Sequence, residues 1–352
     1  IYLLFLMPFV YFATACFVVW LVKTSGIYPS GSDTMYHVYR GDYVYNAIKS
    51  GNWYPLYDPA WYNGVEILRY WSPFPAYVMA FCQYLAGGSQ FGAYLFYIGG
   101  VCFLGACVWP FIGRGFNRPY LGAFIGLLWF FMPNNLCAIF IEGNLARSLS
   151  MIFLPVFIYA VYKYLYNHKL RYIPLMVFTF LLMELCHLGY AGMVAIAVII
   201  YGIVYMIQKG RKKAVLDVVI SMIFGFMLLG IWLVASLRGG ITSLDNSENM
   251  ANFFQNLWIT INPFERLTRG FEYFYFGFAA LVVIVFGILF GYKKSRTGFV
   301  TGFIILLMTT KSAYAVLKHL PGSQYLWMLR FISIALCMIL MSFLMWDRLK
   351  KP

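Results

Sequence analysis

Residues 172–213 decide the fold class and read YIPLMVFTFLLMELCHLGYAGMVAIAVIIYGIVYMIQKGRKK. The two apolar runs, 171–187 and 190–207, each approach the roughly 20 helical residues that cross the hydrocarbon core of a bilayer. The segment between them, CHLGYAG, contains a histidine and two glycines, and the basic cluster KGRKK follows the second run. Lys and Arg gather in short cytosolic loops, so this pattern predicts a hairpin of two transmembrane helices whose basic end faces the cytosol.

The rest of the chain repeats this apolar character. Of its 352 residues 62% are hydrophobic and only 11% are charged, whereas soluble domains carry about 25% charged residues. The predicted fold is an all-α polytopic transmembrane helix bundle of about ten spans, forming a single domain over residues 1–352. The predicted spans are 2–22, 91–112, 120–140, 148–165, 171–187, 190–207, 214–236, 273–292, 298–310 and 329–346.

The segment 72–88 is short and contains two prolines, and it is predicted to lie along the membrane surface without crossing. With this choice the Lys- and Arg-rich loops between the spans all fall on one side, as the positive-inside rule requires. The opposite, non-cytosolic side then receives a large first outer loop, 24–90, with juxtamembrane helices, and a second large outer loop, 237–272.

The most polar stretch directly follows the first span and contains SGSDTMYHVYR, residues 30–40. A helix that begins near Asp33 would place Asp33, His37 and Arg40 on one face, because these residues are spaced i, i+4 and i+7. Asp33 could also cap that helix, and a capping carboxylate could still act as a catalytic base. Asp42 is a further carboxylate nearby.

Aromatic residues follow in GNWYPLYDPAWYNG, residues 51–64. Trp53, Tyr54 and Trp61 belong to this stretch. Such residues form belts at membrane interfaces, and they could also stack on a sugar ring. The sequence leaves both interpretations open.

Ionisable residues within or beside apolar spans are costly and are usually functional. Glu142 and Arg147 follow a span, and Arg147 could offer its planar fork to a phosphate or simply pair with Glu142. His187, at the top of the apolar hairpin, is interpreted as structural. Arg330 opens the last span, where it could extend towards the membrane surface or bind an anionic head group.

Several of these motifs together resemble the GT-C superfamily of polytopic glycosyltransferases. Within it the chain is similar to the membrane proteins labelled 6-pyruvoyl-tetrahydropterin synthase-related and to the YfhO-like transferases. The motifs that carry the resemblance are SGSDTMYHVYR, IKSGNWYPLYDPAWYNG, YWSPFPAYV, EGNLARSL and LPGSQYLWMLRF. The chain has no zinc-binding histidine set, so no pterin chemistry is expected. Many relatives look longer, and the resemblance therefore implies a further outer domain after residue 352.

The resemblance implies an inverting transferase at the outer face of the plasma membrane. Its donor would be a polyprenyl-phosphate-linked sugar held among membrane lipids, and its acceptor a cell-envelope glycan or protein. Asp33 would be the catalytic base, with Arg330, Arg147 and Arg40 on the donor phosphate. His37, Asp42, Glu142 and His187 would support them, and Trp53, Tyr54 and Trp61 would stack on the acceptor sugar.

No cofactor is required by these motifs. Asp33 and His37 could both contribute ligands to a divalent cation such as Mg or Mn. The net charge of +14 comes from short clusters between apolar runs, so no nucleic-acid partner is expected. A lipid or polysaccharide transporter or flippase, and a non-catalytic membrane scaffold, remain alternatives.

Overall fold

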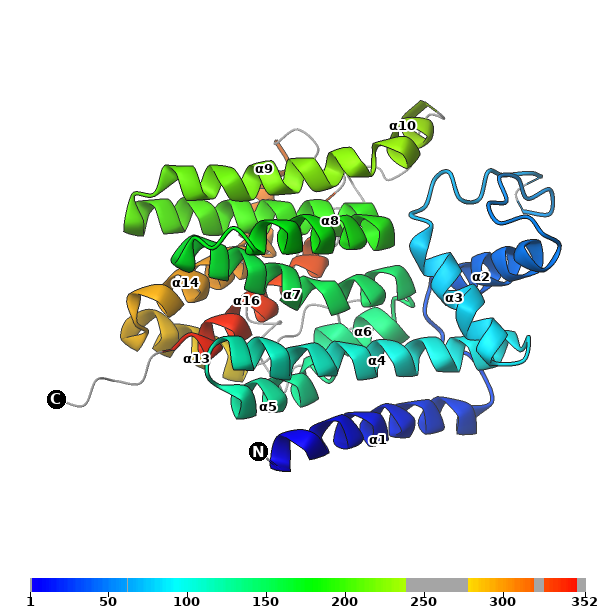
Figure 1. Ribbon diagram of the computed structural model, residues 1–352, viewed down its shortest axis with the longest axis horizontal. Helices are drawn as coiled ribbons and strands as arrows, with labels where there is room; N and C mark the ends of the chain where they lie inside the picture. Colours follow the sequence, from blue (N-terminus) through cyan, green and yellow to red (C-terminus); the bar gives the residue numbers. More distant parts are fainter. Residues whose placement is uncertain (1, 62, 239–277, 320–325, 347–352) are drawn as a thin grey trace.

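The computed structural model describes residues 2–61, 63–238, 278–319 and 326–346, and these residues form a bundle of helices (Figure 1). The all-α prediction is confirmed for this part of the chain. The predicted second outer loop, 237–272, lies outside the described residues after Arg238. The helices of the bundle are α1 (Tyr2–Ser25), α4 (Gln90–Gly115), α5 (Pro119–Trp129), α6 (Pro133–Phe140), α7 (Leu145–Asn167), α8 (Tyr172–Lys209), α9 (Lys212–Leu228), α10 (Gly230–Arg238), α13 (Phe278–Phe290), α14 (Lys293–Met308), α15 (Lys311–Leu317) and α16 (Phe331–Leu344), with the 3₁₀ turn η3 (Met328–Arg330) before α16.

Helix α7 lies in the centre of the bundle and α1 at its edge (Figure 1). In their most apolar windows, 83% of the residues of α7 are buried, compared with 22% for α1. The outer face of α1 presents large apolar side chains such as Phe9, which is 72% exposed. A soluble protein rarely exposes such a continuous apolar face, so this face is suited to contact with lipid.

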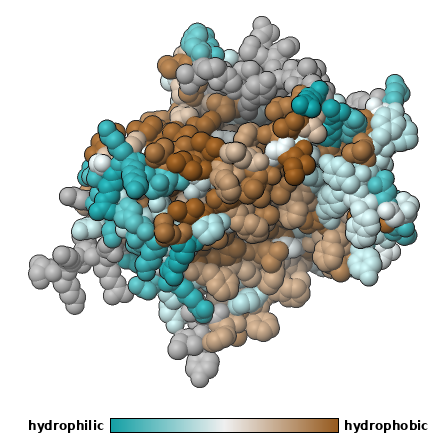
Figure 2. All heavy atoms as spheres, turned by 45° about the horizontal axis from the view of Figure 1, so that its top comes forward, coloured by the Kyte–Doolittle hydropathy of each residue, from teal (hydrophilic) through white to brown (hydrophobic). Residues whose placement is uncertain are grey.

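The space-filling view supports a membrane-embedded bundle. Figure 2 shows hydrophobic residues in a broad band between hydrophilic patches on its two sides. Four of the described helices are long and apolar enough to cross a membrane, or up to six spans if each of two bent helix pairs is counted as one. The ten predicted spans are therefore not confirmed.

The bends explain part of this difference. The predicted span 120–140 is divided into α5 and α6, whose axes differ by 43°. Pro133 begins α6 and disfavours a helical backbone at Met132, which is extended at φ −62°, ψ 135°. The predicted span 214–236 likewise becomes α9 and α10, at 66° to each other, with Gly230 at the bend.

Helix α8 contains both predicted spans of the hairpin. The backbone of His187 leaves helical geometry at φ −156°, ψ 94°. The rings of Tyr172 and Tyr159 lie 6.0 Å apart, and the hydroxyl of Tyr205 donates to the carbonyl of Leu165. Both ends of α8 thus lie beside the end of α7, so the chain turns back at His187 through a tighter turn than the predicted CHLGYAG loop.

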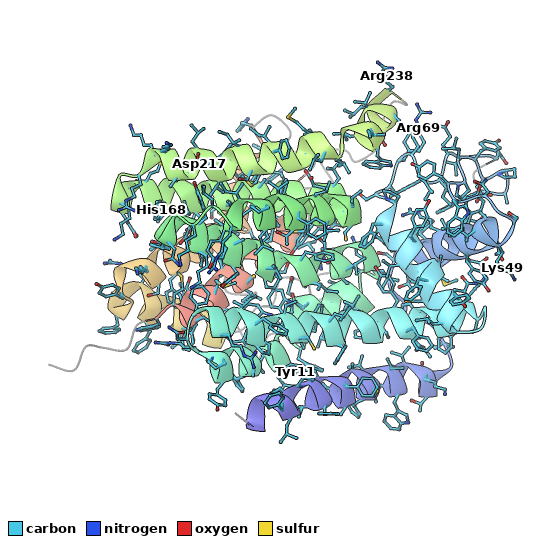
Figure 3. The ribbon with its side chains drawn as sticks, in the orientation of Figure 1. Tyr11, Lys49, Arg69, His168, Asp217 and Arg238 are labelled. Atoms are coloured by element: carbon cyan, nitrogen blue, oxygen red, sulfur yellow. The ribbon has the colours of Figure 1, made fainter. Side chains whose placement is uncertain are left out.

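The basic loops meet at one end of the bundle. Lys163 there donates to the carbonyl of Gly115, and Arg211 contacts His168. Figure 3 shows His168 and Asp217 at this end, whereas Lys49 and Arg69 lie at the other. The basic loops between α4 and α5, between α7 and α8 and between α8 and α9 therefore lie at the same end of the bundle.

The opposite end carries α2 (Thr34–Lys49) and α3 (Phe74–Leu85) of the predicted first outer loop (Figure 1). Helix α3 has 12 residues and so measures about 18 Å, well short of the roughly 30 Å of a hydrocarbon core. This length agrees with a segment that does not cross. A small second core joins the two helices to the loop between them, through Val44, Ile67, Leu68, Ala76 and Ala80.

Candidate functional site

The beginning of α2 is held against the turn between α6 and α7. The backbone N–H of Asp33 donates to the carbonyl of Glu142 at 2.9 Å, and the hydroxyl of Ser32 donates to the same carbonyl at 3.0 Å. Gly143 has a φ of +65°, and a Cβ on Gly31 would lie 2.6 Å from the Cα of Gly143. This close contact of two backbones brings Asp33 to a segment more than a hundred residues away in sequence.

A cavity of about 650 Å³ lies at this end of the bundle. Its walls come from α2, the loop before α3 and the start of α3, the α6–α7 turn and the start of α7, the break in α8, α10 and the residue before α16. The lining residues are Asp33, Tyr36, His37, Arg40, Trp61, Ile67, Leu68, Tyr70, Trp71, Ser72, Pro75, Ala76, Asn144, Ala146, Cys186, His187, Leu188, Gly189, Trp232 and Arg330.

Asp33, His37 and Arg40 all line the cavity, which confirms the prediction that they share one helix face. Asp33 occupies the N-cap position of α2, but its side chain makes no capping hydrogen bond. The hydroxyl oxygen of Ser32, whose proton is directed to the carbonyl of Glu142, lies 3.4 Å from Oδ1 of Asp33. The Asp33 carboxylate therefore does not cap α2, and it borders the cavity.

His37 is partly exposed and lines the cavity. Burial, followed by the positive charge of Arg40, lowers the pKa of His37 to about 3. The imidazole is therefore neutral near pH 7, so it can exchange hydrogen bonds with a ligand without adding charge to the cavity.

Arg40 lies over an aromatic wall. Its guanidinium carbon is 4.0 Å from the ring centroid of Trp71 and 5.5 Å from that of Trp61. The Trp61 ring is stacked between Tyr36 and Trp71, at interplanar angles of 12° and 3°. Cation–π contacts of this kind hold a guanidinium in one orientation, so Arg40 is a fixed positive group at the cavity wall.

Two of the three predicted stacking residues lie elsewhere. Trp53 and Tyr54 do not line the cavity, and their side chains are 70% and 46% exposed. Trp61 does line it. Their exposure outside the cavity favours an interface position for Trp53 and Tyr54.

Glu142 lies between two arginines. Its Oε1 is 2.9 Å from Nη2 of Arg147, and its Oε2 is 3.7 Å from Nε of Arg330. Arg147 is fully buried and does not line the cavity. It is therefore the partner of Glu142, not a group that reaches a ligand in the cavity.

Asp42 also lies outside the cavity lining. Its Oδ1 accepts a hydrogen bond from the Gln83 side chain at 2.6 Å, which links α2 to α3. Asp42 follows Arg40 by two residues, a rotation of about 200° in an α-helix, so its side chain points to the opposite face of α2.

His187, at the break in α8, is the meeting point of three elements. Its Nε2 lies 3.3 Å from Nη1 of Arg330 and 3.5 Å from Nδ2 of Asn144. Its Nδ1 accepts the backbone N–H of Tyr190 at 3.1 Å. His187 thus begins the second helical segment of α8 and also reaches the cavity.

Few other side chains that could bind a metal ion lie near the predicted ligands Asp33 and His37 in the described part of the chain. Within residues 2–61, 63–238, 278–319 and 326–346, no group of three or more His, Cys, Asp or Glu side chains lies close enough to hold a metal ion. A divalent cation bound only by protein side chains needs more donors than this pair supplies. The donor set does not fit such a site, so no step of the chemistry below passes through a metal.

The cavity lining also contains Tyr36, Trp71, Asn144 and Trp232, which were not among the predicted site residues. Tyr36 could have been found, because it lies three residues after Asp33 on the same helix face. Trp232 could not, because only the 66° bend before α10 brings it to the cavity. Its Nε1 donates to the carbonyl of Leu68 at 2.7 Å.

Comparison with family models matches residues 68–352 to the 6-pyruvoyl-tetrahydropterin synthase related domain, described as a membrane protein family. The matched region contains Glu142, Asn144, His187 and Arg330, and Asp33 lies before it. Comparison with curated proteins and with solved structures gave no match. Since the family model covers most of the 352 residues and the bundle has several apolar helices long enough to cross a membrane, the chain belongs to the membrane protein family of the 6-pyruvoyl-tetrahydropterin synthase related domain.

Proposed function

We propose that the protein is an inverting glycosyltransferase that takes a sugar from a polyprenyl-phosphate-linked donor at the non-cytosolic face of the plasma membrane. The observation that carries this proposal is the cavity at the end of the bundle, in which the carboxylate of Asp33 and the guanidinium groups of Arg40 and Arg330 share one lining. This combination supplies both a base for a nucleophile and positive charge for an anionic leaving group.

Each of these groups has a separate role in the proposed reaction. Asp33 takes the proton from an acceptor hydroxyl while the hydroxyl oxygen attacks the anomeric carbon of the donor sugar. The bond from that carbon to the phosphate oxygen breaks with inversion, and the electron pair leaves with the polyprenyl phosphate. Arg330 and Arg40 stabilise the charge that develops on this phosphate. The prenyl chain stays in the bilayer beside the apolar flank of the bundle.

The aromatic wall supports a carbohydrate ligand. Tyr36 and Trp71 line the cavity and are 42% and 38% exposed, so each leaves part of its ring surface accessible. Sugar rings present C–H groups that pack against aromatic faces. We place the acceptor sugar at this wall, beside Arg40, in place of the predicted contacts with Trp53 and Tyr54.

The test compares Asp33→Asn with Asp42→Asn in purified protein supplied with a polyprenyl-phosphate sugar and a glycan acceptor. Loss of a general base lowers the rate by roughly 10²–10⁴-fold, and we expect this loss in Asp33→Asn. Asp42 lies on the same helix but outside the cavity, so Asp42→Asn should transfer sugar close to the parental rate. Normal transfer by Asp33→Asn would refute the assignment of the base.

A lipid flippase is the second candidate, because two helix pairs are bent by 43° and 66°. Broken spans that end beside a binding site are common in transporters. In sealed vesicles a flippase would move the lipid-linked sugar between leaflets without consuming it. Chemical transfer of the sugar to the acceptor, with release of the polyprenyl phosphate, distinguishes the enzyme from the flippase.

A further inference from the structure

The hydrogen bonds of His187 fix which of its ring nitrogens carries the proton. The backbone N–H of Tyr190 donates to Nδ1 at 3.1 Å, so Nδ1 holds a lone pair. A neutral imidazole with its lone pair on Nδ1 has its proton on Nε2. The Nε2–H group points towards the cavity side of the residue, where Asn144 and Arg330 lie.

The two nearest partners of this Nε2–H group are themselves donors. The side-chain oxygen of Asn144 accepts the backbone N–H of Arg147 at 2.9 Å, which leaves the amide nitrogen of Asn144 facing His187 at 3.5 Å. Nη1 of Arg330 lies 3.3 Å from the same Nε2. Three N–H groups from the α6–α7 turn, the α8 break and the start of α16 therefore converge at the cavity wall.

We propose that these three N–H groups bind one oxyanion, a phosphate oxygen of the lipid-linked donor. Three N–H donors directed to one place suit an acceptor with several lone pairs, and an anionic oxygen accepts all three. The charge balance agrees, because Arg147 and Arg330 carry two positive charges around the single carboxylate of Glu142. Asn144 and His187 thereby join Arg330 as phosphate-binding residues.

Identification of the ligand as the phosphate of a lipid rests on the proposed function. The donors alone select a phosphate oxygen, whether from free phosphate or from a prenyl phosphate. The position of the three residues at the end of a bundle with lipid-facing helices favours the second source. Because binding can be measured without sugar transfer, the two proposals can fail separately.

The test uses two substitutions at His187, each of which keeps the contact of one ring nitrogen and removes that of the other. The side chain of Asn places a polar atom near Nδ1, whereas that of Gln reaches the position of Nε2. His187→Asn therefore keeps the contact with the Tyr190 N–H and loses the donor to the cavity. His187→Gln does the reverse. Binding of a short-chain prenyl phosphate to each purified protein is measured by calorimetry, with the prenol and inorganic phosphate as comparison ligands.

We expect His187→Asn to weaken prenyl phosphate binding by about 10–100-fold, the effect of losing one hydrogen bond to a charged group. His187→Gln should bind within a few-fold of the parent protein. Equal binding by parent and His187→Asn, with lower thermal stability of His187→Gln, would show a purely structural role and overturn the inference.

Asn144→Asp gives a second test, because it keeps the acceptor for the Arg147 N–H and replaces the cavity-facing N–H₂ with an anionic oxygen. It should remain folded and lose prenyl phosphate binding, and retention of binding would contradict the inference. Equal binding of inorganic phosphate and prenyl phosphate would overturn the lipid assignment. Phosphate binding without sugar transfer would contradict the proposed function and leave this inference intact.

Discussion

Burial of the His37 imidazole in the cavity wall determines how the folded protein responds to acid at this site. The pKa of His37 is lowered to about 3 by burial and by the charge of Arg40, whereas the unfolded chain binds this proton near pH 6.5. Between these values the unfolded state binds more protons than the folded state. The free energy of unfolding therefore decreases as the pH falls from about 6.5 towards 3.

His37→Gln removes this contribution while keeping a polar side chain at the cavity. We expect the melting temperature of the variant to decrease less than that of the parent protein between pH 7 and pH 4.5. Thermal unfolding in detergent across this range provides the measurement. Parallel curves for the two proteins would contradict the burial of the neutral imidazole.

At the scale of elements, the contact between the start of α2 and the α6–α7 turn decides whether Asp33 reaches the cavity. Gly143 has a φ of +65°, and a Cβ there would lie 2.6 Å from the backbone nitrogen of Thr34. Gly26 is the matched control, because its φ is +69° but a Cβ there would meet nothing within 4 Å. Both alanine variants adopt an unfavourable left-handed backbone, and only one also separates the two elements.

Gly143→Ala should therefore be less stable than Gly26→Ala by about 1–3 kcal/mol, the usual cost of overpacking. It should also lose sugar transfer, because Asp33 moves with α2. Thermal unfolding and the transfer assay measure the two effects. Equal stability of the two variants would mean that the backbones are not in close contact at Gly143.

For the whole molecule, the two ends of the bundle differ in their chemistry. Lys163, Lys169 and Arg211 belong to the basic end, and α2 and α3 lie at the cavity end (Figure 1). The positive-inside rule places the basic end in the cytosol. With this orientation the cavity would face the non-cytosolic side, where the proposed lipid-linked donor and envelope acceptor would meet.

Cysteine labelling tests this orientation with Asn52→Cys and Lys169→Cys, both at exposed positions and at opposite ends. A membrane-impermeant maleimide should label Asn52→Cys in intact cells and Lys169→Cys only after permeabilisation. The parent protein supplies the background from its own cysteines. Labelling of both variants from the same side would contradict the predicted topology.

Several features of the site followed from local sequence. The i, i+4, i+7 spacing placed Asp33, His37 and Arg40 on one face, and the structure confirms this because helical periodicity depends only on neighbouring residues. The direction in which the Arg147 side chain points did not follow from the local sequence. Its burial depends on Glu142 and on the cap from Asn144, which fix the first turn of α7 inside the protein.

Sequence by itself determined the all-α membrane-embedded character of the protein and the segregation of its basic loops, because both follow from the solvation of residues along a continuous stretch of chain. Only the tertiary structure decided which polar residues meet. Asp33, Asn144, His187 and Arg330 come from distant segments, and the Gly31–Gly143 contact, the break at His187 and the bends at Pro133 and Gly230 bring the walls of one cavity together. Long-range packing of this kind is set by the fit between elements, which no local pattern of residues encodes.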